Sequence, residues 1–461
     1  MDKKEQDKKE LKYEDLSLPT FTYSTKIGRI GSVDLDMSDA LKAFVLSGLS
    51  GIVVGHSETG KSYFGKLVNK HYFGNNGILI QGASMEENSD LITQIAKKIN
   101  LKEANVEVDI DILNKPYWLV EEIGAIPKPL QSSFYPVGDG ILPHQGKQYP
   151  LGTELGDGNR YFSLLATSNS INGEDKTGEE YGNFGITRAT ASRFHLCFDL
   201  RHYSRTKKDL SDMLLEDREF INPRHSVSSG KENQGITDKI LQAYKNINKS
   251  ASNPSLEELA AWQLISMGTS NCINGSPHQK IRDSWEHECP ECNHSDKCKS
   301  KFFNAYELLR TQDAVRIYAN ALAYTASLKD PNAEISASDA IFTAAKFALA
   351  GKVGLVNPNI LREYNGAEGK LIEDAINGLR EEYGKNEDYI HASLEEAKKG
   401  NVFSRFFEYD GAIGDYSLLS KEKQKKVKLI EPYTDNGSIG LSHMTSFLEG
   451  VSKKYSKKKE E

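Results

Sequence analysis

One short stretch restricts the fold more than any other part of the chain. Residues 51–64 read GIVVGHSETGKSYF, and their centre fits the pattern G-x-x-x-x-G-K-[ST]. The apolar, β-branched run at residues 51–54 is typical of a buried parallel strand. After the loop, apolar side chains recur at helical spacing, at Phe64, Leu67, Val68 and Tyr72. A strand, a glycine-rich loop and a helix in this order predict an α/β fold that binds phosphate at the N-terminus of the helix.

The residues of this loop have distinct expected roles. Backbone N–H groups would surround the phosphates of a nucleotide, along a loop that comprises Gly55, His56, Ser57, Glu58, Thr59, Gly60, Lys61 and Ser62. Lys61 would reach the β and γ phosphates, and the Ser62 hydroxyl would bind Mg²⁺. The alternative is an accidental glycine turn, which the flanking strand and helix disfavour.

Two further apolar strands are predicted, and each is followed by polar residues. Residues 117–120 precede Glu121 and Glu122, and the run at 161–170 carries Asn169 near its end. In a nucleotide hydrolase the first acid would hold Mg²⁺ through water, and the second would polarise the attacking water. Asn169 could orient the same water beside the γ-phosphate. The alternatives are two surface glutamates that open a helix, and an ordinary turn at the asparagine.

In their order along the chain, these residues resemble the MoxR group of AAA+ ATPases. The resemblance rests on four motifs: GHSETGKS (55–62), EEIGAIPKPLQSSF (121–134), ATSNS (166–170) and ATASRF (189–194). A second piece of resemblance lies near residues 305–355. It implies an AAA+ P-loop NTPase core, a helical lid, ATP and Mg²⁺ as ligands, and a homo-oligomer that forms a hexameric ring. It also implies that ATP hydrolysis remodels or activates a protein client, with a von Willebrand A-type protein as an expected partner.

The resemblance also implies roles for polar residues outside the loop. Asn169 becomes sensor 1. Arg193, in SRF, falls where the family places an arginine finger that reaches the neighbouring subunit's site, and Arg188 is the nearby rival. Arg310 falls at the sensor 2 position. The alternative for these arginines is an ordinary role on the surface, in a salt bridge or on a solvated helix face.

The chain departs from the family pattern at three places. Glu121 and Glu122 take the Walker B positions, but the first is glutamate rather than aspartate, so metal geometry could shift and turnover could be slow. The usual S-P-R before the lid helix reads L-L-R, and the phosphate loop lacks an internal proline. An alternative hypothesis for the function is therefore a nucleotide-gated scaffold that does not hydrolyse ATP.

Between the acid pair and Asn169, glycines and prolines flank two short extended pieces at residues 141–144 and 147–151. They predict a β-hairpin that turns at Gln145 and Gly146. In the family such inserts face the pore or a partner; the alternative is a hairpin packed on the core.

Four of the five cysteines fall within one segment, as Cys272, Cys289, Cys292 and Cys298 in the pattern C-x16-C-x2-C-x5-C. Such a group in a reducing compartment predicts a metal site, either Zn²⁺ or an iron–sulfur cluster. His287 or His294 could replace one cysteine in a zinc site, and free or disulfide-bonded cysteines are the alternative. Cys197 alternates with apolar neighbours and is expected on a buried strand.

Composition sets the remaining expectations for the 461 residues. The longest apolar run is short and interrupted, and the N-terminus mixes charges, so we expect neither a membrane span nor a secretory signal, and a cytoplasmic location. The net charge of −7 argues weakly against a nucleic-acid coat, although the cysteines and the hairpin keep a nucleic-acid-stimulated motor open. The predicted domains are a charged leader at 1–29, an α/β core at 30–202, a connector with the Cys-rich segment at 203–304, a helical lid at 305–354, and a mostly helical appendage with a lysine-rich tail at 355–461.

Overall fold

The computed structural model describes residues 11–18, 21–56, 59–85, 97–100, 105–108, 110–144, 146–156, 158–169, 186, 190, 193–215, 234–269, 303–305, 308–355, 364, 368–385, 387–399, 406–409, 412–415, 428–430, 448 and 450–453. Several residues singled out by the sequence lie outside these ranges: Ser57, Glu58, Arg188, Cys272, Cys289, Cys292 and Cys298. The predicted four-cysteine metal site is therefore outside the described residues.

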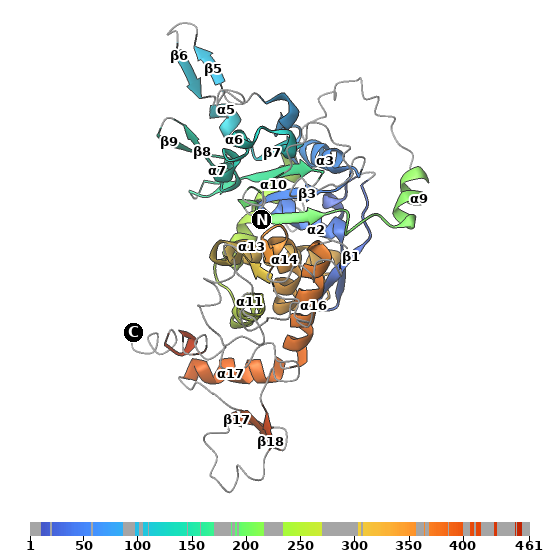
Figure 1. The fold of residues 1–461 in the computed structure, drawn as a ribbon, viewed down its shortest axis with the longest axis vertical. Coiled ribbons are helices and arrows are strands. Elements are labelled where there is room, and N and C mark those ends of the chain that lie inside the picture. Colours follow the sequence, from blue (N-terminus) through green and yellow to red (C-terminus); the bar gives the residue numbers. More distant parts are fainter. Residues whose placement is uncertain are drawn as a thin grey trace, which may run out of the picture. The chain divides into compact units, whose positions relative to one another are not determined.

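A five-stranded parallel sheet lies at the centre of the nucleotide-loop region, as the α/β prediction requires (Figure 1). Its strand order is β13-β3-β12-β7-β4, with β3 at Ser50–Val54, β4 at Ile78–Gln81, β7 at Tyr117–Glu121, β12 at Ser163–Ser168 and β13 at Leu196–Asp199. Every residue of β3, β7 and β12 is buried, as in a parallel sheet covered on both faces. Because the strands are parallel, the carboxyl ends of β3, β12 and β7 lie at one edge of the sheet.

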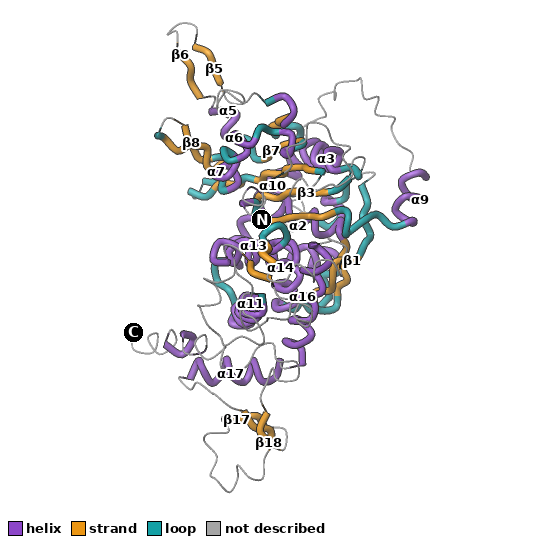
Figure 2. The backbone as a smooth tube through the Cα atoms, viewed as in Figure 1, coloured by secondary structure: helices purple, strands orange, loops and turns teal. Residues whose placement is uncertain are grey.

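Helices α2 (Met37–Ser47), α3 (Lys61–Phe73) and α10 (Gln234–Ala251) belong to the same region as this sheet (Figure 2). Helix α10 contacts both α2 and α3, and α3 contacts β7 and β12. The predicted helical stripe on α3 is confirmed, because Phe64, Leu67, Val68 and Tyr72 are all buried. Helix α3 starts after Gly60, whose φ of 86° is a left-handed conformation that glycine adopts without strain.

The chain divides into two compact units. The first comprises residues 1–253, 309–336 and 347–352, and the second comprises 254–308, 337–346 and 353–461. Helix α13 (Leu308–Lys329) lies almost wholly in the first unit, whereas α14 (Ala337–Leu349) contributes mostly to the second. The segment predicted as a helical lid, 305–354, thus supplies residues to both units.

The remaining elements of the first unit are short. Antiparallel pairs form between β1 (Lys26–Ile30) and β2 (Val33–Asp36), β5 (Lys97–Asn100) and β6 (Asn105–Val108), β8 (Ile141–His144) and β9 (Lys147–Pro150), and β10 (Thr153–Glu154) and β11 (Arg160–Tyr161). The β8–β9 pair confirms the predicted hairpin. Short helices are η1 (Glu14–Leu16), η2 (Gly82–Ser84), α5 (Ile110–Leu113), η3 (Ile123–Ala125), α6 (Lys128–Gln131), α7 (Phe134–Gly138) and α9 (Lys207–Leu215).

The second unit is built mainly from helices. Helix α11 (Leu256–Gly268) packs against α16 (Glu368–Lys385) and α17 (Glu387–Lys399). Strands β14 (Phe303–Ala305) and β15 (Val353–Leu355) pair, and β16 (Phe406–Tyr409) pairs with both β17 (Ala412–Asp415) and β18 (Lys428–Ile430).

A buried group of charges connects three segments of the first unit. The Asp39 carboxylate is fully buried and accepts hydrogen bonds from Lys329 Nζ at 2.7 Å and from the Tyr13 hydroxyl at 2.5 Å. Lys42 Nζ lies 3.6 Å away. Asp39 also forms a capping box with Asp36 at the start of α2. Burial alone would raise the pKa of Asp39, but Lys42, Lys329 and Tyr13 outweigh it and hold the pKa below its usual range.

Candidate functional site

The ammonium group of Lys61 lies within the glycine-rich loop. Lys61 is 8% exposed, and its Nζ donates to the backbone oxygens of Gly55 and His56, both at 2.7 Å. It also donates to Asn169 Oδ1 at 3.0 Å. The loop closes on itself because the Thr59 hydroxyl donates to the His56 oxygen at 2.9 Å. The structure therefore brings together Lys61 and Asn169, two residues chosen independently from the sequence and separated by 108 positions.

Hydrogen bonds connect the carboxyl ends of β3, β12 and β7. The Gly55 N–H donates to the Ser168 oxygen at 3.2 Å, and the Glu122 N–H donates to Thr167 Oγ1 at 3.0 Å. The loop, Asn169 and Glu122 thus extend from one edge of the sheet, where polar groups can meet a ligand. Thr167, the second residue of the ATSNS motif, holds the backbone at Glu122 in place.

Glu122 has an unusual backbone conformation. Its φ of 53° and ψ of 54° lie in the left-handed region, and Asn75 is the other described non-glycine residue with positive φ. A glutamate in this region costs free energy, and such residues concentrate at functional sites. The Glu122 side chain is exposed, in contrast to the buried strand before it. The conformation turns an accessible carboxylate out of the sheet edge immediately after β7.

Glu121 is held differently from Glu122. It is 7% exposed, and its Oε1 lies 3.0 Å from Lys66 Nζ while its Oε2 accepts from Gln81 Nε2 at 3.5 Å. Lys66 follows Ser62 by four residues on α3, so both lie on the same face of that helix. Glu121 thus lies beside the helix face that carries the Ser62 hydroxyl. Carboxylate and hydroxyl oxygens suit Mg²⁺, and a metal held there would compete with Lys66 for Glu121.

Arg193 lies at the opposite edge of the sheet. It precedes β13 by three residues, and its guanidinium carbon lies 5.5 Å from the centre of the Tyr135 ring. His195 hydrogen-bonds Ser50 at the start of β3, whereas the phosphate loop follows the end of β3. Strand β3 has five residues, each about 3.3 Å long, so roughly 16 Å separates its start, near Arg193, from its end, where the phosphate loop begins. The structure does not bring Arg193 to the loop of its own chain.

Arg310 belongs to the first turn of α13, and its side chain lies outside the described residues. The next residue, Thr311, is fully buried and lies 3.4 Å from Lys352 Nζ. The same ammonium group donates to the backbone oxygen of His195 at 3.2 Å. The start of α13 therefore lies near the same sheet edge as Arg193, away from the chain's own loop.

At that edge a serine, a histidine and an aspartate also meet. Ser50 Oγ lies 2.7 Å from His195 Nδ1, and His195 Nε2 lies 3.8 Å from Asp139 Oδ1. The Ser50 backbone N–H also donates to Nδ1 at 3.1 Å, so in the neutral ring the proton belongs on Nε2. Because Ser50 is 2% exposed, a substrate cannot approach its hydroxyl. The group holds the start of β3 beside β13 and is not a nucleophilic site.

Arg205, which no sequence motif marks, lies beside the loop. A Cβ atom on Gly60 would lie 3.0 Å from one of its guanidinium nitrogens. The guanidinium carbon lies 4.4 Å from the centre of the Tyr23 ring, and Tyr23 in turn donates to the Thr59 oxygen. Among the described residues the buried Arg205 Nε has no hydrogen-bond partner. A cation thus lies against the last glycine of the loop, from a segment 145 residues later in the chain.

Two other expectations concern cysteines and membranes. Cys197 is buried on β13, as predicted. None of the helices in the described part of the chain is both long and apolar enough to cross a membrane.

Comparison with known proteins finds distant likeness to solved structures. No protein-family model matches the sequence, and no curated protein matches it. Among solved structures, the chain is similar to "a putative ATPase" from Cytophaga hutchinsonii, with 16% sequence identity and a TM-score of 0.47. The match covers 74% of this chain and 87% of that chain. A likeness this distant carries no functional conclusion, so the site is characterised by its own residues: a phosphate-type loop whose lysine contacts Asn169, with Glu122 at the neighbouring strand end.

Proposed function

We propose that this chain is an AAA+ ATPase of MoxR type that binds ATP with Mg²⁺ and hydrolyses it. The observation that carries the proposal is the contact of Lys61 with Asn169, with Glu122 at the carboxyl end of the adjacent strand. The left-handed backbone of Glu122 supports a role beyond packing, because strain of this kind persists where function requires it.

Each residue has a role that follows from its position. The N-terminus of α3 and the loop N–H groups bind phosphate oxygens, and Lys61 supplies a positive charge to them. Glu122 accepts the proton of the attacking water as its oxygen bonds to the γ-phosphorus and the bond to the β–γ bridging oxygen breaks, giving ADP and phosphate. Asn169 orients that water through its side-chain amide. Ser62 and Glu121 would hold Mg²⁺, which neutralises phosphate charge when bound.

The arginines at the opposite sheet edge support a shared site. We assign Arg193 to the nucleotide of an adjacent subunit, since it cannot reach the loop of its own chain. Arg310 would keep the sensor 2 role that the resemblance implies. In a closed ring of identical subunits, six in the family that the sequence resembles, the Arg193 of each subunit would lie beside the phosphate loop of the next. The expected output of the ring is remodelling of a protein client, with a von Willebrand A-type protein as a partner.

The shared site predicts complementation between two inactive variants. Lys61→Ala and Arg193→Ala should each lose ATP hydrolysis alone. In an equimolar mixture about a quarter of the contacts pair an intact loop with an intact arginine, so roughly a quarter of the native rate should return. Phosphate release measured before and after mixing, at constant total protein, checks this. Mixing Lys61→Ala with Arg201→Ala, an arginine paired with Asp199 in its own chain, is the matched control. No recovery in the Arg193 mixture, with both variants folded, would contradict the assignment.

Arg205 predicts a separate effect on affinity. A guanidinium beside Gly60 can donate a charge-assisted hydrogen bond to a phosphate or sugar oxygen, so Arg205→Gln should weaken ATP binding by roughly tenfold or more. Fluorescent-nucleotide titration measures this, with Arg201→Gln from the same segment as control. An unchanged dissociation constant with a lowered melting temperature would instead assign Arg205 to packing on Tyr23 alone.

The four-cysteine segment enters this proposal only as a structural element. Cys272, Cys289, Cys292 and Cys298 would bind Zn²⁺ or an iron–sulfur cluster and stabilise a segment with little apolar content. Metal analysis of the purified protein, with and without thiol-blocking reagent, distinguishes zinc from iron.

A further inference from the structure

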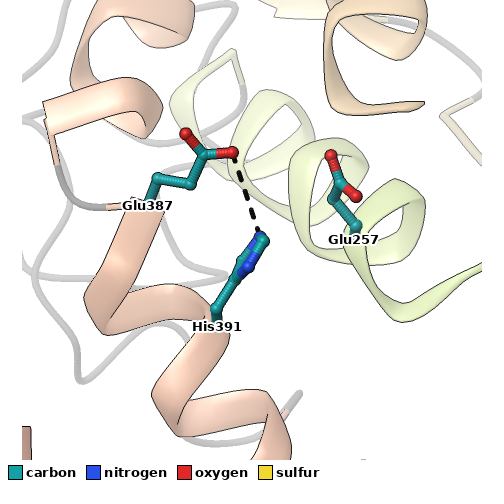
Figure 3. A group of neighbouring side chains, drawn as sticks. All are labelled: Glu257, Glu387 and His391. Atoms are coloured by element: carbon teal, nitrogen blue, oxygen red, sulfur yellow. Dashed lines mark ion pairs between the residues drawn. The ribbon is translucent and has the colours of Figure 1, made fainter. Parts of the chain in front are cut away.

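Three potential metal ligands converge within the second unit. Glu257 lies on α11, and Glu387 and His391 lie on α17. One ligand atom from each side chain lies within 4.8 Å of the other two. Figure 3 shows Glu387 and His391 on one helix, with Glu257 facing them from another. The sequence alone had marked none of these residues, because 130 positions separate Glu257 from Glu387.

The helices fix two of the three side chains relative to each other. Glu387 and His391 are four residues apart, so they lie one above the other on the same face of α17. Glu387 Oε1 lies 4.0 Å from His391 Nε2. A carboxylate and an imidazole with this spacing can both bind one ion, as i, i+4 ligands on a helix do in zinc proteins.

Glu257 is oriented from a third helix. The backbone N–H of Ser338, at the start of α14, donates to Glu257 Oε1 at 3.2 Å. This bond holds the glutamate in place and leaves Oε2 for another partner. Among the described residues neither Glu257 nor Glu387 forms an ion pair with a lysine or arginine, and the nearby Arg380 already pairs with Asp339 at 2.7 Å. Two carboxylates thus lie beside one histidine, without a lysine or arginine among the described residues that pairs with either.

A buried hydroxyl points to a ligand in the same place. Tyr383, on α16, is 3% exposed, and its ring packs edge-on against Phe342 with centres 5.5 Å apart. Its hydroxyl is buried and lies near the Ser338 side chain, although it forms no hydrogen bond of ordinary geometry with the described residues. Burial, with the Glu257 and Glu387 carboxylates nearby, raises the pKa of Tyr383, so the group remains a neutral donor. A water bound to a metal ion would give this hydroxyl a better acceptor.

We infer that Glu257, Glu387 and His391 form a site for a divalent transition-metal ion, with Zn²⁺ as the best-matched type. Two carboxylate oxygens and one imidazole nitrogen match the three protein ligands of an open zinc site, whose remaining position takes a water. The ion would link α11 to α17 and bring Tyr383 into its outer shell of hydrogen bonds. None of the four cysteines is among these three ligands.

An ordinary surface ion pair is the competing account. A protonated His391 beside Glu387 would explain the contact between those two residues, since exposed pairs of this kind are common and weak. It would leave one histidine to balance two carboxylates, whereas a divalent ion would balance both.

The test is a Zn²⁺ titration of the full chain after removal of metal with a chelator, in competition with a chromophoric zinc indicator. The unmodified protein should bind one more equivalent of Zn²⁺ than His391→Ala, Glu387→Gln or Glu257→Gln. If a variant still binds this equivalent, its affinity for Zn²⁺ should be roughly a hundredfold weaker. Tyr383→Phe should weaken this equivalent by about tenfold. Asp388→Asn, which removes an exposed carboxylate on the same helix, is the matched control and should change nothing.

Two further readings separate this site from other effects. With Co²⁺ in place of Zn²⁺, the thiolate charge-transfer band of the cysteines should persist in His391→Ala. For each protein, the melting temperature is measured with and without Zn²⁺. The increase caused by Zn²⁺ should be larger for the unmodified protein than for His391→Ala. Equal zinc stoichiometry and affinity in the unmodified protein and in His391→Ala would overturn the inference, as would binding only at millimolar Zn²⁺. Neither outcome depends on ATP hydrolysis.

Discussion

Glu122→Gln is expected to bind ATP as tightly as the unmodified protein and to hydrolyse it 10²- to 10⁴-fold more slowly, the order of magnitude that a lost general base costs. Glutamine has almost the same shape as glutamate, so the Glu122 N–H to Thr167 hydrogen bond and the left-handed backbone should remain. The change removes the proton acceptor and leaves Lys61 and the loop N–H groups in place. Binding and hydrolysis should therefore separate.

Two measurements establish this separation. Nucleotide affinity is read by titration in the presence of Mg²⁺, and turnover by phosphate release at saturating ATP. Glu154→Gln is the matched control, since Glu154 is exposed on β10 and lies 3.9 Å from Arg160, away from the loop. Turnover by Glu122→Gln at the native rate would remove Glu122 from the proposed chemistry, while loss of both binding and turnover would indicate a role in folding the loop.

Asp39→Ala is expected to destabilise the first unit by about 3–5 kcal/mol, which is typical when one partner of a buried ion pair is removed. The substitution would leave the Lys329 and Lys42 ammonium groups without their shared carboxylate and would remove half of the capping box on α2. It also takes away the acceptor of the Tyr13 hydroxyl. The melting transition of this unit should fall by on the order of 10 °C.

Calorimetry at neutral pH measures this shift, and Asp34→Asn is the control because Asp34 forms an exposed ion pair with Lys26. The pH dependence has a defined sign. Because the pKa of Asp39 is lowered in the folded protein, its contribution is complete above the unfolded pKa and is lost as the pH falls through the folded value. The difference between Asp39→Ala and the unmodified protein should therefore shrink in acid. A difference that does not change with pH would show that Asp39 acts only as a helix cap.

The local features of the site could be predicted from the sequence. The strand, loop and helix at 51–73 have distinct periodicities, and the polar residues Glu122 and Asn169 follow apolar runs that had to be parallel strands. Once strand direction is known, the position of Arg193 before β13 also places it at the edge opposite the loop. These inferences need only short segments and the rule that parallel strands share their carboxyl edge.

Contacts between distant segments could not be predicted in this way. No local pattern indicates that Lys66 pairs with Glu121, that Arg205 reaches Gly60, or that Lys329 joins Asp39. Each depends on how whole elements pack, and a single charged residue gives no periodic signal. The left-handed backbone of Glu122 was equally hidden, because glycine or asparagine is the residue expected at such a position.

The separation of Arg193 from the loop of its own chain gives the subunit a direction. One edge of the sheet would receive an arginine and the other would donate one. A head-to-tail contact between copies would leave an unmatched donor and an unmatched receiver at the two ends of any open string of subunits. Only closure of the string matches every pair. The rotation between successive copies then decides whether the assembly ends as a ring or continues as a filament.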